Sequence, residues 1–166
     1  MIKRLFFFLV GCALLAPQPG WARDKTGTPL LVVSGNLVQH GKARAPLVFD
    51  EATLRALPQH TFTVATPWHP RAQRFEGPLL RDVLAAAGAA GQTLSLRALN
   101  DYVITIPLED AEQYDVILAR KRNGKPMTVR DKGPLFVIYP FHQHPELRQA
   151  EYYRRCVWQL AEIIVH

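Results

Sequence analysis

The chain has 166 residues, with 20 Lys and Arg against 14 Asp and Glu, 48% apolar side chains and only two cysteines. This length fits one domain, and the apolar fraction can fill a core, so the composition excludes a disordered, collagen-like or disulfide-stapled chain. Two cysteines cannot build a four-cysteine zinc site. A dispersed formal net charge of +6 does not indicate a nucleic-acid-binding protein.

Residues 1–22 have the pattern of a signal peptide. Two bases precede an apolar run from Leu5 to Ala16, and Gly20-Trp21-Ala22 forms a small-x-small cleavage site. The run is shorter than the roughly 20 residues that a membrane-spanning helix needs, so we expect no transmembrane segment in the mature chain. We therefore expect export to the periplasm, with residues 23–166 forming a single domain.

Cys12 lies in Leu9-Val10-Gly11-Cys12, which also resembles a bacterial lipobox and would make Cys12 a lipidated N-terminus. The apolar run continues past Cys12, which makes lipidation the weaker alternative. Cleavage after Ala22 removes two bases and no acid, so the formal net charge falls from +6 to +4. Cys156 is then the only thiol, and we expect it to be a buried small apolar side chain rather than a nucleophile.

Strand patterns dominate the mature chain, with two main helix patterns between them. Apolar runs, caps and turn residues predict, in chain order, a strand at 30–33, a helix from the Asp50 cap to Pro58, a strand at 60–66, a loop at 67–77, a helix from Pro78 to Gly88, and strands at 94–99 and 102–106.

The C-terminal half continues in the same way. It predicts a hairpin of 116–122 and 127–129 across Asn123-Gly124, a strand at 135–139, a short helix at 145–150 and a strand at 157–165. This order predicts an α+β fold with mixed, largely antiparallel sheets and two main helices, rather than alternating βαβ units.

Charge is unevenly distributed along the chain. Residues 101–115 carry five acids and no base, whereas residues 120–132 carry six bases and one acid. Such runs usually form solvated faces, and the alternative is a docking surface.

Side chains suited to ligand binding are concentrated in two regions. One is the loop after the strand at 60–66, since strand ends and helix starts often converge on ligands. The other begins at Tyr139, where arginines and tyrosines would suit an anion. The candidate binding residues are Thr66, Trp68, His69, Arg71, Arg74, Tyr102, His142 and Arg148.

Other chemistries have less support. His142 and His144 could share a metal with His69, but no Cys or acid lies at matching spacing. GxGxxG, GxxxxGK, GxSxG, HExxH and CxxC patterns are absent from the sequence. We therefore assign no catalytic residue and no metal ligand.

A longer series of motifs is more specific. F-x-G-x-x-L-x-D-x-L-x-x-x-G at 75–88 is followed by N-D-Y, N-G-x-P, G-P-L and W-Q-L in that order. Over residues 29–165 the chain resembles the oxidoreductase molybdopterin-binding domain of the sulfite oxidase family, and most closely its short, signal-bearing periplasmic members. The resemblance implies a mixed α+β fold around a pterin-sized pocket.

The resemblance also implies a departure from the enzymes. Enzymatic members have a molybdenum-ligating cysteine just after the strand that matches 60–66, and this chain has Thr66-Pro67-Trp68 there. Neither a hydroxyl nor an indole replaces a thiolate ligand. His69-Pro70-Arg71 does not match the Asn and Arg that follow that cysteine. Lys3-Arg4 is half a twin-arginine pair, which favours general secretion of an unfolded, cofactor-free chain.

We therefore expect a periplasmic ligand-binding or partner module that lacks molybdenum ligation. Its ligand would be a small anionic or pterin-like molecule, and its partner an envelope signalling or redox protein. No cofactor is expected, although the family implies molybdopterin. The alternatives are a molybdopterin-dependent oxidoreductase with an atypical ligand set and a histidine-based metal-binding protein.

Overall fold

The computed structural model describes residues 27–166. The predicted signal peptide, its cleavage site and Cys12 lie outside the described residues. Within residues 27–166, no helix is long and apolar enough to cross a membrane. The architecture is α+β with mostly antiparallel pairing, which confirms the predicted fold class.

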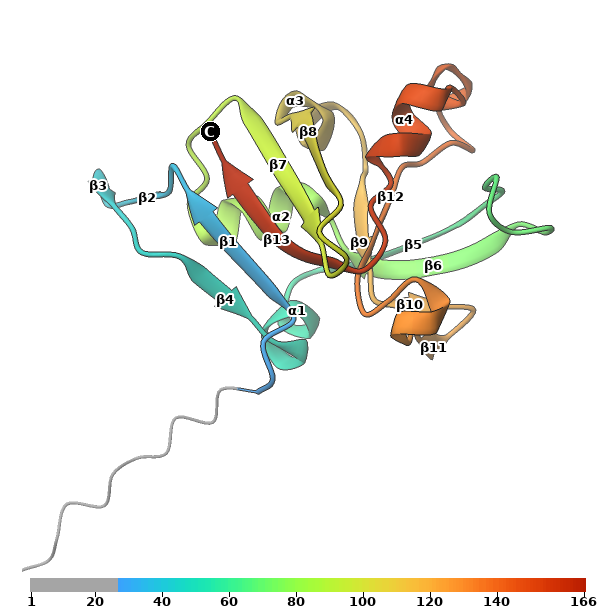
Figure 1. The fold of residues 1–166 in the computed structure, drawn as a ribbon, viewed down its shortest axis with the longest axis horizontal. Coiled ribbons are helices and arrows are strands. Elements are labelled where there is room, and N and C mark those ends of the chain that lie inside the picture. Colours follow the sequence, from blue (N-terminus) through green and yellow to red (C-terminus); the bar gives the residue numbers. More distant parts are fainter. Residues whose placement is uncertain (1–26) are drawn as a thin grey trace, which may run out of the picture.

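A five-stranded sheet forms one half of the molecule (Figure 1). Its strand order is β4-β1-β13-β7-β8, with bounds Leu47–Phe49, Leu31–Gly35, Leu160–Val165, Thr93–Ala98 and Val103–Pro107. The late strand β13 lies in the middle, parallel to β1 and antiparallel to β7. Residues far apart in the chain therefore meet along this strand.

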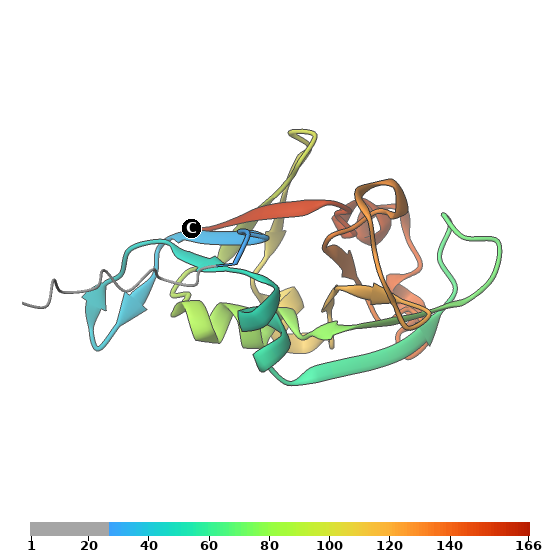
Figure 2. The same cartoon turned by 90° about the horizontal axis from the view of Figure 1, so that it is seen from below.

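Two predicted helices accompany this sheet. α1 (Glu51–Ala56) begins at a capping box, in which the Asp50 side chain accepts from the Thr53 backbone N–H and the Asp50 backbone N–H donates to the Thr53 hydroxyl. α2 (Leu80–Ala87) buries its periodic apolar face and ends at Gly88 with φ 76°. Figure 2 shows α2 under one face of the sheet.

A second sheet has the order β11-β10-β6-β5. Its strands span Lys125–Pro126, Lys121–Arg122, Gln73–Pro78 and Gln59–Val64. Asn123 and Gly124 both have positive φ in the two-residue turn between β10 and β11, which confirms the predicted hairpin turn, although its paired arms are only 121–122 and 125–126. β6 occupies part of the expected loop at 67–77, because residues 73–78 pair fully with β5; the connecting loop is therefore only 65–72.

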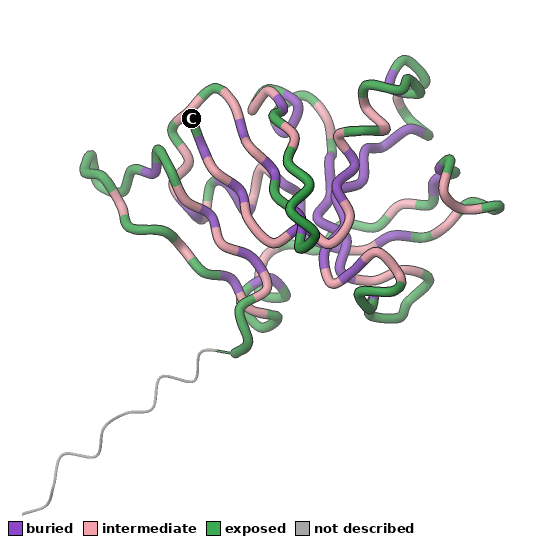
Figure 3. The backbone as a smooth tube through the Cα atoms, in the orientation of Figure 1, coloured by how far each residue is buried: buried purple, intermediate pink, exposed green. Residues whose placement is uncertain are grey.

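The deepest part of the core is the two-stranded pair of β9 (Ile117–Ala119) and β12 (Phe136–Ile138), whose six residues are all buried. Figure 3 shows this buried centre between the two sheets. Gly77 on β6 lies so close to β9 that a side-chain carbon there would overlap the Leu118 carbonyl oxygen.

Short elements complete the fold. They are β2 (Val38–Gln39), β3 (Lys42–Ala43), α3 (Glu109–Gln113), the 3-10 turns η1 (Val129–Asp131) and η2 (Pro145–Leu147), and α4 (Ala150–Arg155). The strand expected at 127–129 is absent: the strand that pairs with β10 is β11 at 125–126, residues 127 and 128 are irregular, and Val129 begins η1. The helix expected at 145–150 is replaced by η2 followed by α4. β13 begins at Leu160, so Cys156 lies at the end of α4 and not in the closing strand.

Candidate ligand-binding cavity

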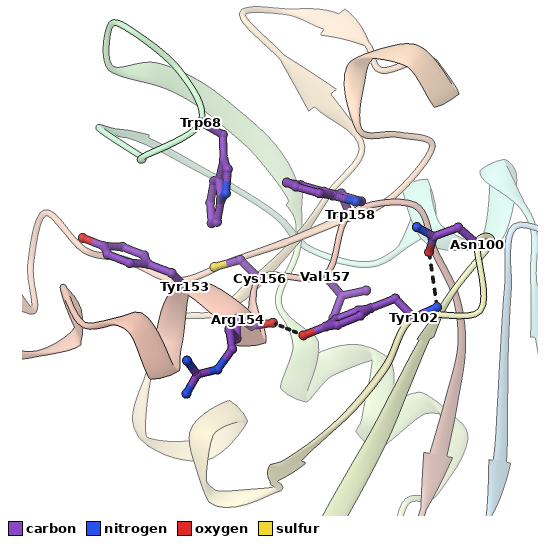
Figure 4. A pocket seen from close by; sticks show the side chains of 8 residues that line it. All are labelled: Trp68, Asn100, Tyr102, Tyr153, Arg154, Cys156, Val157 and Trp158. Carbon is purple, nitrogen blue, oxygen red and sulfur yellow. Dashed lines mark hydrogen bonds between the residues drawn. The ribbon is translucent and has the colours of Figure 1, made fainter.

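A cavity of about 310 Å³ opens between the two halves of the molecule (Figure 4). Three segments that are distant in sequence build it: the 65–72 loop, the β7–β8 turn, and α4 with the chain that leads from it to β13. Its lining residues are Trp68, Asn100, Tyr102, Tyr153, Arg154, Cys156, Val157 and Trp158. Aromatic rings therefore dominate its wall.

Trp68 is the ring around which the others are arranged. Its indole makes edge-to-face contacts with Phe136, Tyr153 and Trp158, at centroid distances of 5.7, 6.1 and 5.9 Å. Such T-shaped pairs are favourable because a ring edge is positive and a ring face negative. Phe136 belongs to the buried pair of strands, so the core fixes the position of Trp68.

The β7–β8 turn is tied to α4 across one side of the cavity. The Tyr102 hydroxyl donates to the Arg154 carbonyl oxygen at 3.2 Å, and Asn100 Oδ1 accepts from the Tyr102 backbone N–H at 3.3 Å. In Figure 4 the Arg154 guanidinium points away from both tryptophans. Arg154 thus helps to build the cavity through its backbone.

Cys156 forms part of the floor and is only 5% exposed. Burial raises the pKa of its thiol to about 12, so the sulfur is protonated near neutral pH. This burial confirms the expectation of a small apolar residue. Its place on the cavity wall was not expected.

A buried polar network lies beside this floor. Asp110 Oδ2 accepts from the Tyr139 hydroxyl and from the Arg155 guanidinium, each at 2.6 Å. Burial and the Asp110 carboxylate raise the pKa of Tyr139 well above its usual value. Because Arg155 lies on α4 and Asp110 on α3, their ion pair attaches α4 to the core.

His69 extends the site toward β10. Its Nδ1 lies 2.8 Å from the Thr66 hydroxyl, and its Nε2 lies 2.8 Å from the Arg122 guanidinium. Because arginine can only donate, Nε2 is the acceptor, and the neutral ring carries its proton on Nδ1 and donates to Thr66. Burial, Arg122 and Lys132 lower the pKa of His69, which favours this neutral form.

A cation backs the second tryptophan. Lys132 Nζ lies 3.7 Å from the centroid of the Trp158 ring, which is cation–π geometry. Burial and the neighbouring Arg122 lower the pKa of Lys132. Arg122 in turn donates to Asp131 at 3.1 Å.

The candidate residues divide into three groups. Trp68 and Tyr102 line the cavity, and Thr66 and His69 lie in the same loop as Trp68. The other four lie outside the lining: Arg71, Arg74, His142 and Arg148.

The contacts of three of these, Arg74, His142 and Arg148, explain their separation from the cavity. Arg74 is paired through its backbone to Asn123 at the tip of the β10–β11 hairpin, and the ring of His142 packs on Phe62 at 5.0 Å. Arg148 Nε donates to the Phe141 carbonyl oxygen at 3.0 Å. Of the eight candidate residues, only Trp68 and Tyr102 therefore line the cavity.

Six lining residues were missed: Asn100, Tyr153, Arg154, Cys156, Val157 and Trp158. Two of them had a sequence signal, since Asn100 opens the N-D-Y motif and Trp158 opens W-Q-L. Tyr153 and Arg154 lie in α4, within the region from Tyr139 whose tyrosines and arginines drew attention, but they were not chosen as site residues. Cys156 and Val157 meet the cavity through the path of the chain after α4, which no local pattern specifies.

Metal ligation by histidines lacks a geometric basis. Both ring nitrogens of His69 already have protein partners, Thr66 and Arg122. His144 Nδ1 lies 3.0 Å from Glu146. In the part of the chain from 27 to 166, no group of three or more His, Cys, Asp or Glu side chains is placed to hold a metal ion.

Fold and cavity together define an α+β domain with an aromatic-walled cavity. The model of the oxidoreductase molybdopterin-binding domain family matches residues 33–143, about two thirds of the chain, and the chain belongs to that family. The match includes Trp68 and Tyr102 and ends before Tyr153, so the wall contributed by α4 lies beyond it. No curated protein matches the chain.

Proposed function

We propose that this protein is an exported binding module that uses a molybdopterin-type fold without ligating molybdenum. The observation that carries the proposal is the wall of the cavity: Trp68 stands in the loop where enzymatic relatives are expected to carry their metal-ligating cysteine. Aromatic rings bind a planar ligand by stacking and edge contacts, whereas they supply no ligand to a metal.

The donor set at the loop does not fit molybdenum. The family chemistry needs a thiolate there, and Cys156, the one cysteine among residues 27–166, is buried at the end of α4. Cys156 is the residue directly after α4, and it does not belong to the loop that carries Thr66 and Trp68. A soft anionic ligand is therefore missing where the family chemistry would require it.

A metal-free pterin or a ring of similar size fits better. The cavity volume of about 310 Å³ lies at the lower end of the ~300–1,000 Å³ typical of small-molecule sites. Trp68, Tyr153 and Trp158 supply flat apolar surface, and each aromatic pair formed with a ligand contributes about 0.5–1.5 kcal/mol beyond burial.

The metal content of the purified protein tests whether molybdenum is bound. Mature protein recovered from the periplasm should contain less than about one tenth of an equivalent of molybdenum by mass spectrometry, because the 65–72 loop carries no cysteine to ligate it. Stoichiometric molybdenum would overturn the proposal and favour an oxidoreductase with an atypical ligand set. Stoichiometric zinc or copper that is lost in His142→Ala/His144→Ala would favour a histidine-based metal protein.

Ligand binding tests the cavity itself. Pterin-6-carboxylate should raise the melting temperature of the mature protein, because a ligand that binds only the folded state stabilises it. Trp68→Leu and Trp158→Leu should remove most of the rise. Val48→Ala, an exposed position on β4, should retain it. An unchanged melting temperature in the wild type at millimolar probe would count against the binding function.

Export and periplasmic location belong to the same proposal, and the signal-peptide pattern at 1–22 supports them. Expression of the full chain in bacteria should give a periplasmic protein whose first residue is Arg23. A mature protein that begins with a lipidated Cys12 and sediments with membranes would replace the secreted form by a lipoprotein.

We propose that an envelope protein docks over the mouth of the cavity. Four exposed apolar side chains lie on the segments joined by Gln159, which accepts from the Leu99 N–H and donates to the Val129 carbonyl, both at 2.9 Å. They are Leu99, Tyr102, Val103 and Val129, each 42 to 55% exposed. The bases Arg130 and Arg154 border them, so the partner surface should be apolar with an acidic rim.

Photocrosslinking in living cells tests this docking. A crosslinking side chain at Val103 should form one defined adduct, and Arg130→Glu should weaken the adduct by reversing the charge of the border. The same side chain at Val48, on the far strand β4, should form none. Equal labelling from both positions would contradict the proposed surface.

A further inference from the structure

The shape of the cavity admits two kinds of ligand. Four rings contribute to its wall, from Trp68, Tyr102, Tyr153 and Trp158. Aromatic cages of this kind bind quaternary ammonium groups through cation–π attraction, and aromatic walls equally bind flat neutral or anionic rings by stacking. Charge around the wall decides between them.

Lys132 places a positive charge behind one wall. Its Nζ lies 3.7 Å from the Trp158 centroid, but Lys132 is not among the residues that line the cavity. The ammonium therefore covers the indole face turned away from the ligand space. A cation on one face attracts the π electrons and weakens the negative potential of the opposite face, which makes that face poorer for a second cation.

Nearby carboxylates do not offset this charge. Among the residues that line the described cavity none is acidic. Asp131 is paired with Arg122 beside Lys132, and Asp110 is held by Arg155 and Tyr139. A cationic ligand would therefore enter the cavity without a counter-charge, which is costly in a partly desolvated site.

The free polar groups of the tryptophans agree with this charge balance. The indole N–H groups of Trp68 and Trp158 donate only, and neither has a hydrogen-bond partner among the described residues. A ligand that carries oxygen or ring-nitrogen acceptors could use them, whereas a quaternary ammonium could not.

We infer that the cavity selects neutral or anionic planar rings over cationic rings of the same size, and that Lys132 sets this preference through Trp158. The inference rests on the proposed binding function and names the ligand class for it. Lys132 is a specificity-determining residue that acts from behind the wall, without touching the ligand.

Three bicyclic probes of similar size test the inference. They are quinoline-2-carboxylate, 2-methylquinoline and N-methylquinolinium, titrated at pH 7.5 with binding followed by tryptophan fluorescence and calorimetry. The wild type should bind the carboxylate at least about tenfold more tightly than the quinolinium, with the neutral ring between them.

Matched variants separate an effect of Lys132 through Trp158 from the effect of losing one positive charge. Lys132→Met should reduce the anion-to-cation affinity ratio by about fivefold or more, and Lys132→Arg should keep it because a guanidinium also stacks on an indole. Lys125→Met removes the same charge from β11 without touching Trp158, and should leave the ratio within twofold. Melting temperatures show that each variant is folded.

The possible outcomes distinguish a failure of the proposed charge selection from a failure of the proposed ligand-binding function. Equal affinity for the three rings, or a preference for the quinolinium, would overturn the charge selection while leaving a binding cavity. An equal loss of preference in Lys132→Met and Lys125→Met would overturn transmission through Trp158. Failure of both the rings and pterin-6-carboxylate to bind would overturn the proposed function, and the inference with it.

Discussion

His69 Nε2 accepts a hydrogen bond from the Arg122 guanidinium at 2.8 Å, which joins the 65–72 loop to β10. The contact requires an unprotonated nitrogen, so it exists only while the imidazole is neutral. Because the loop carries Trp68, the protonation state of His69 is linked to the cavity wall.

Acid should therefore weaken the fold in a defined pH range. Folding lowers the pKa of His69 below its usual 6.5, through burial first and then repulsion from Arg122 and Lys132. Above that pH both states hold a neutral ring. As the pH falls below 6.5, the unfolded chain gains a proton first, so the free energy of unfolding decreases until the folded pKa is passed.

Urea unfolding at pH 7.5 and pH 5.0 measures this effect. His69→Gln should lose less stability between the two pH values than the wild type. The pKa of His142 is also lowered by burial, so the variant should reduce the dependence rather than abolish it. His60→Gln, an exposed position on β5, should behave as the wild type does; equal slopes in all three proteins would refute the role of His69.

Tyr139→Phe should cost about 1–3 kcal/mol of unfolding free energy, since it removes a hydrogen bond to a buried carboxylate while keeping the ring. Asp110 would retain Arg155 as its partner. Tyr153→Phe is the matched control, because its hydroxyl has no hydrogen-bond partner among residues 27–166, and it should change stability by less than about 0.5 kcal/mol. Denaturant titrations of the two variants give the comparison, and equal values would show that Tyr139 contributes only its ring.

Gly77→Ala should destabilise the protein by about 3 kcal/mol or more, because its new methyl group would overlap the Leu118 carbonyl on β9. Gly41→Ala separates this overlap from backbone strain. Gly41 has φ 74° and open space around it, so alanine there should cost only about 1–2 kcal/mol. Thermal and urea unfolding would show the difference, and a tolerant Gly77→Ala would mean that β6 can move away from β9.

Cys156 should resist thiol reagents in the folded protein. With a pKa of about 12, roughly one thiol in 10⁴ is ionised at pH 8, and the side chain is also buried. An aromatic disulfide reagent should therefore react with the mature protein at a small fraction of its rate in urea. Fast labelling of the folded form would show an accessible thiolate and would reopen the question of sulfur ligation.

Local sequence signals predicted the elements that local interactions stabilise. The Asp50 cap, the apolar face of α2 and the Asn123-Gly124 turn each act within a few residues, and all three are present. The order of the predicted elements supplied the fold class, and the family resemblance implied the same class. β6 was missed because its pairing with β5, and not an alternating pattern of its own, makes it a strand.

The cavity was only partly predictable, for a related reason. Trp68 and Tyr102 were chosen from chemistry and motif, and both line it. Tyr153 and Trp158 join them because the end of α4 and the turn before β13 bring them back to the 65–72 loop. Arg148 was chosen for its charge, but the 3-10 turn directs its guanidinium to the Phe141 carbonyl. Long-range packing, which a single sequence does not display, decides such positions.

The central place of β13 also sets an order on folding. β1 and β7 are both neighbours of residues 160–165 and do not pair with each other. Until that segment has been synthesised, the main sheet therefore lacks the strand that joins its two halves, and the tryptophan at 158 is missing from the cavity. A nascent chain therefore cannot complete this domain until residues 160–165 are available.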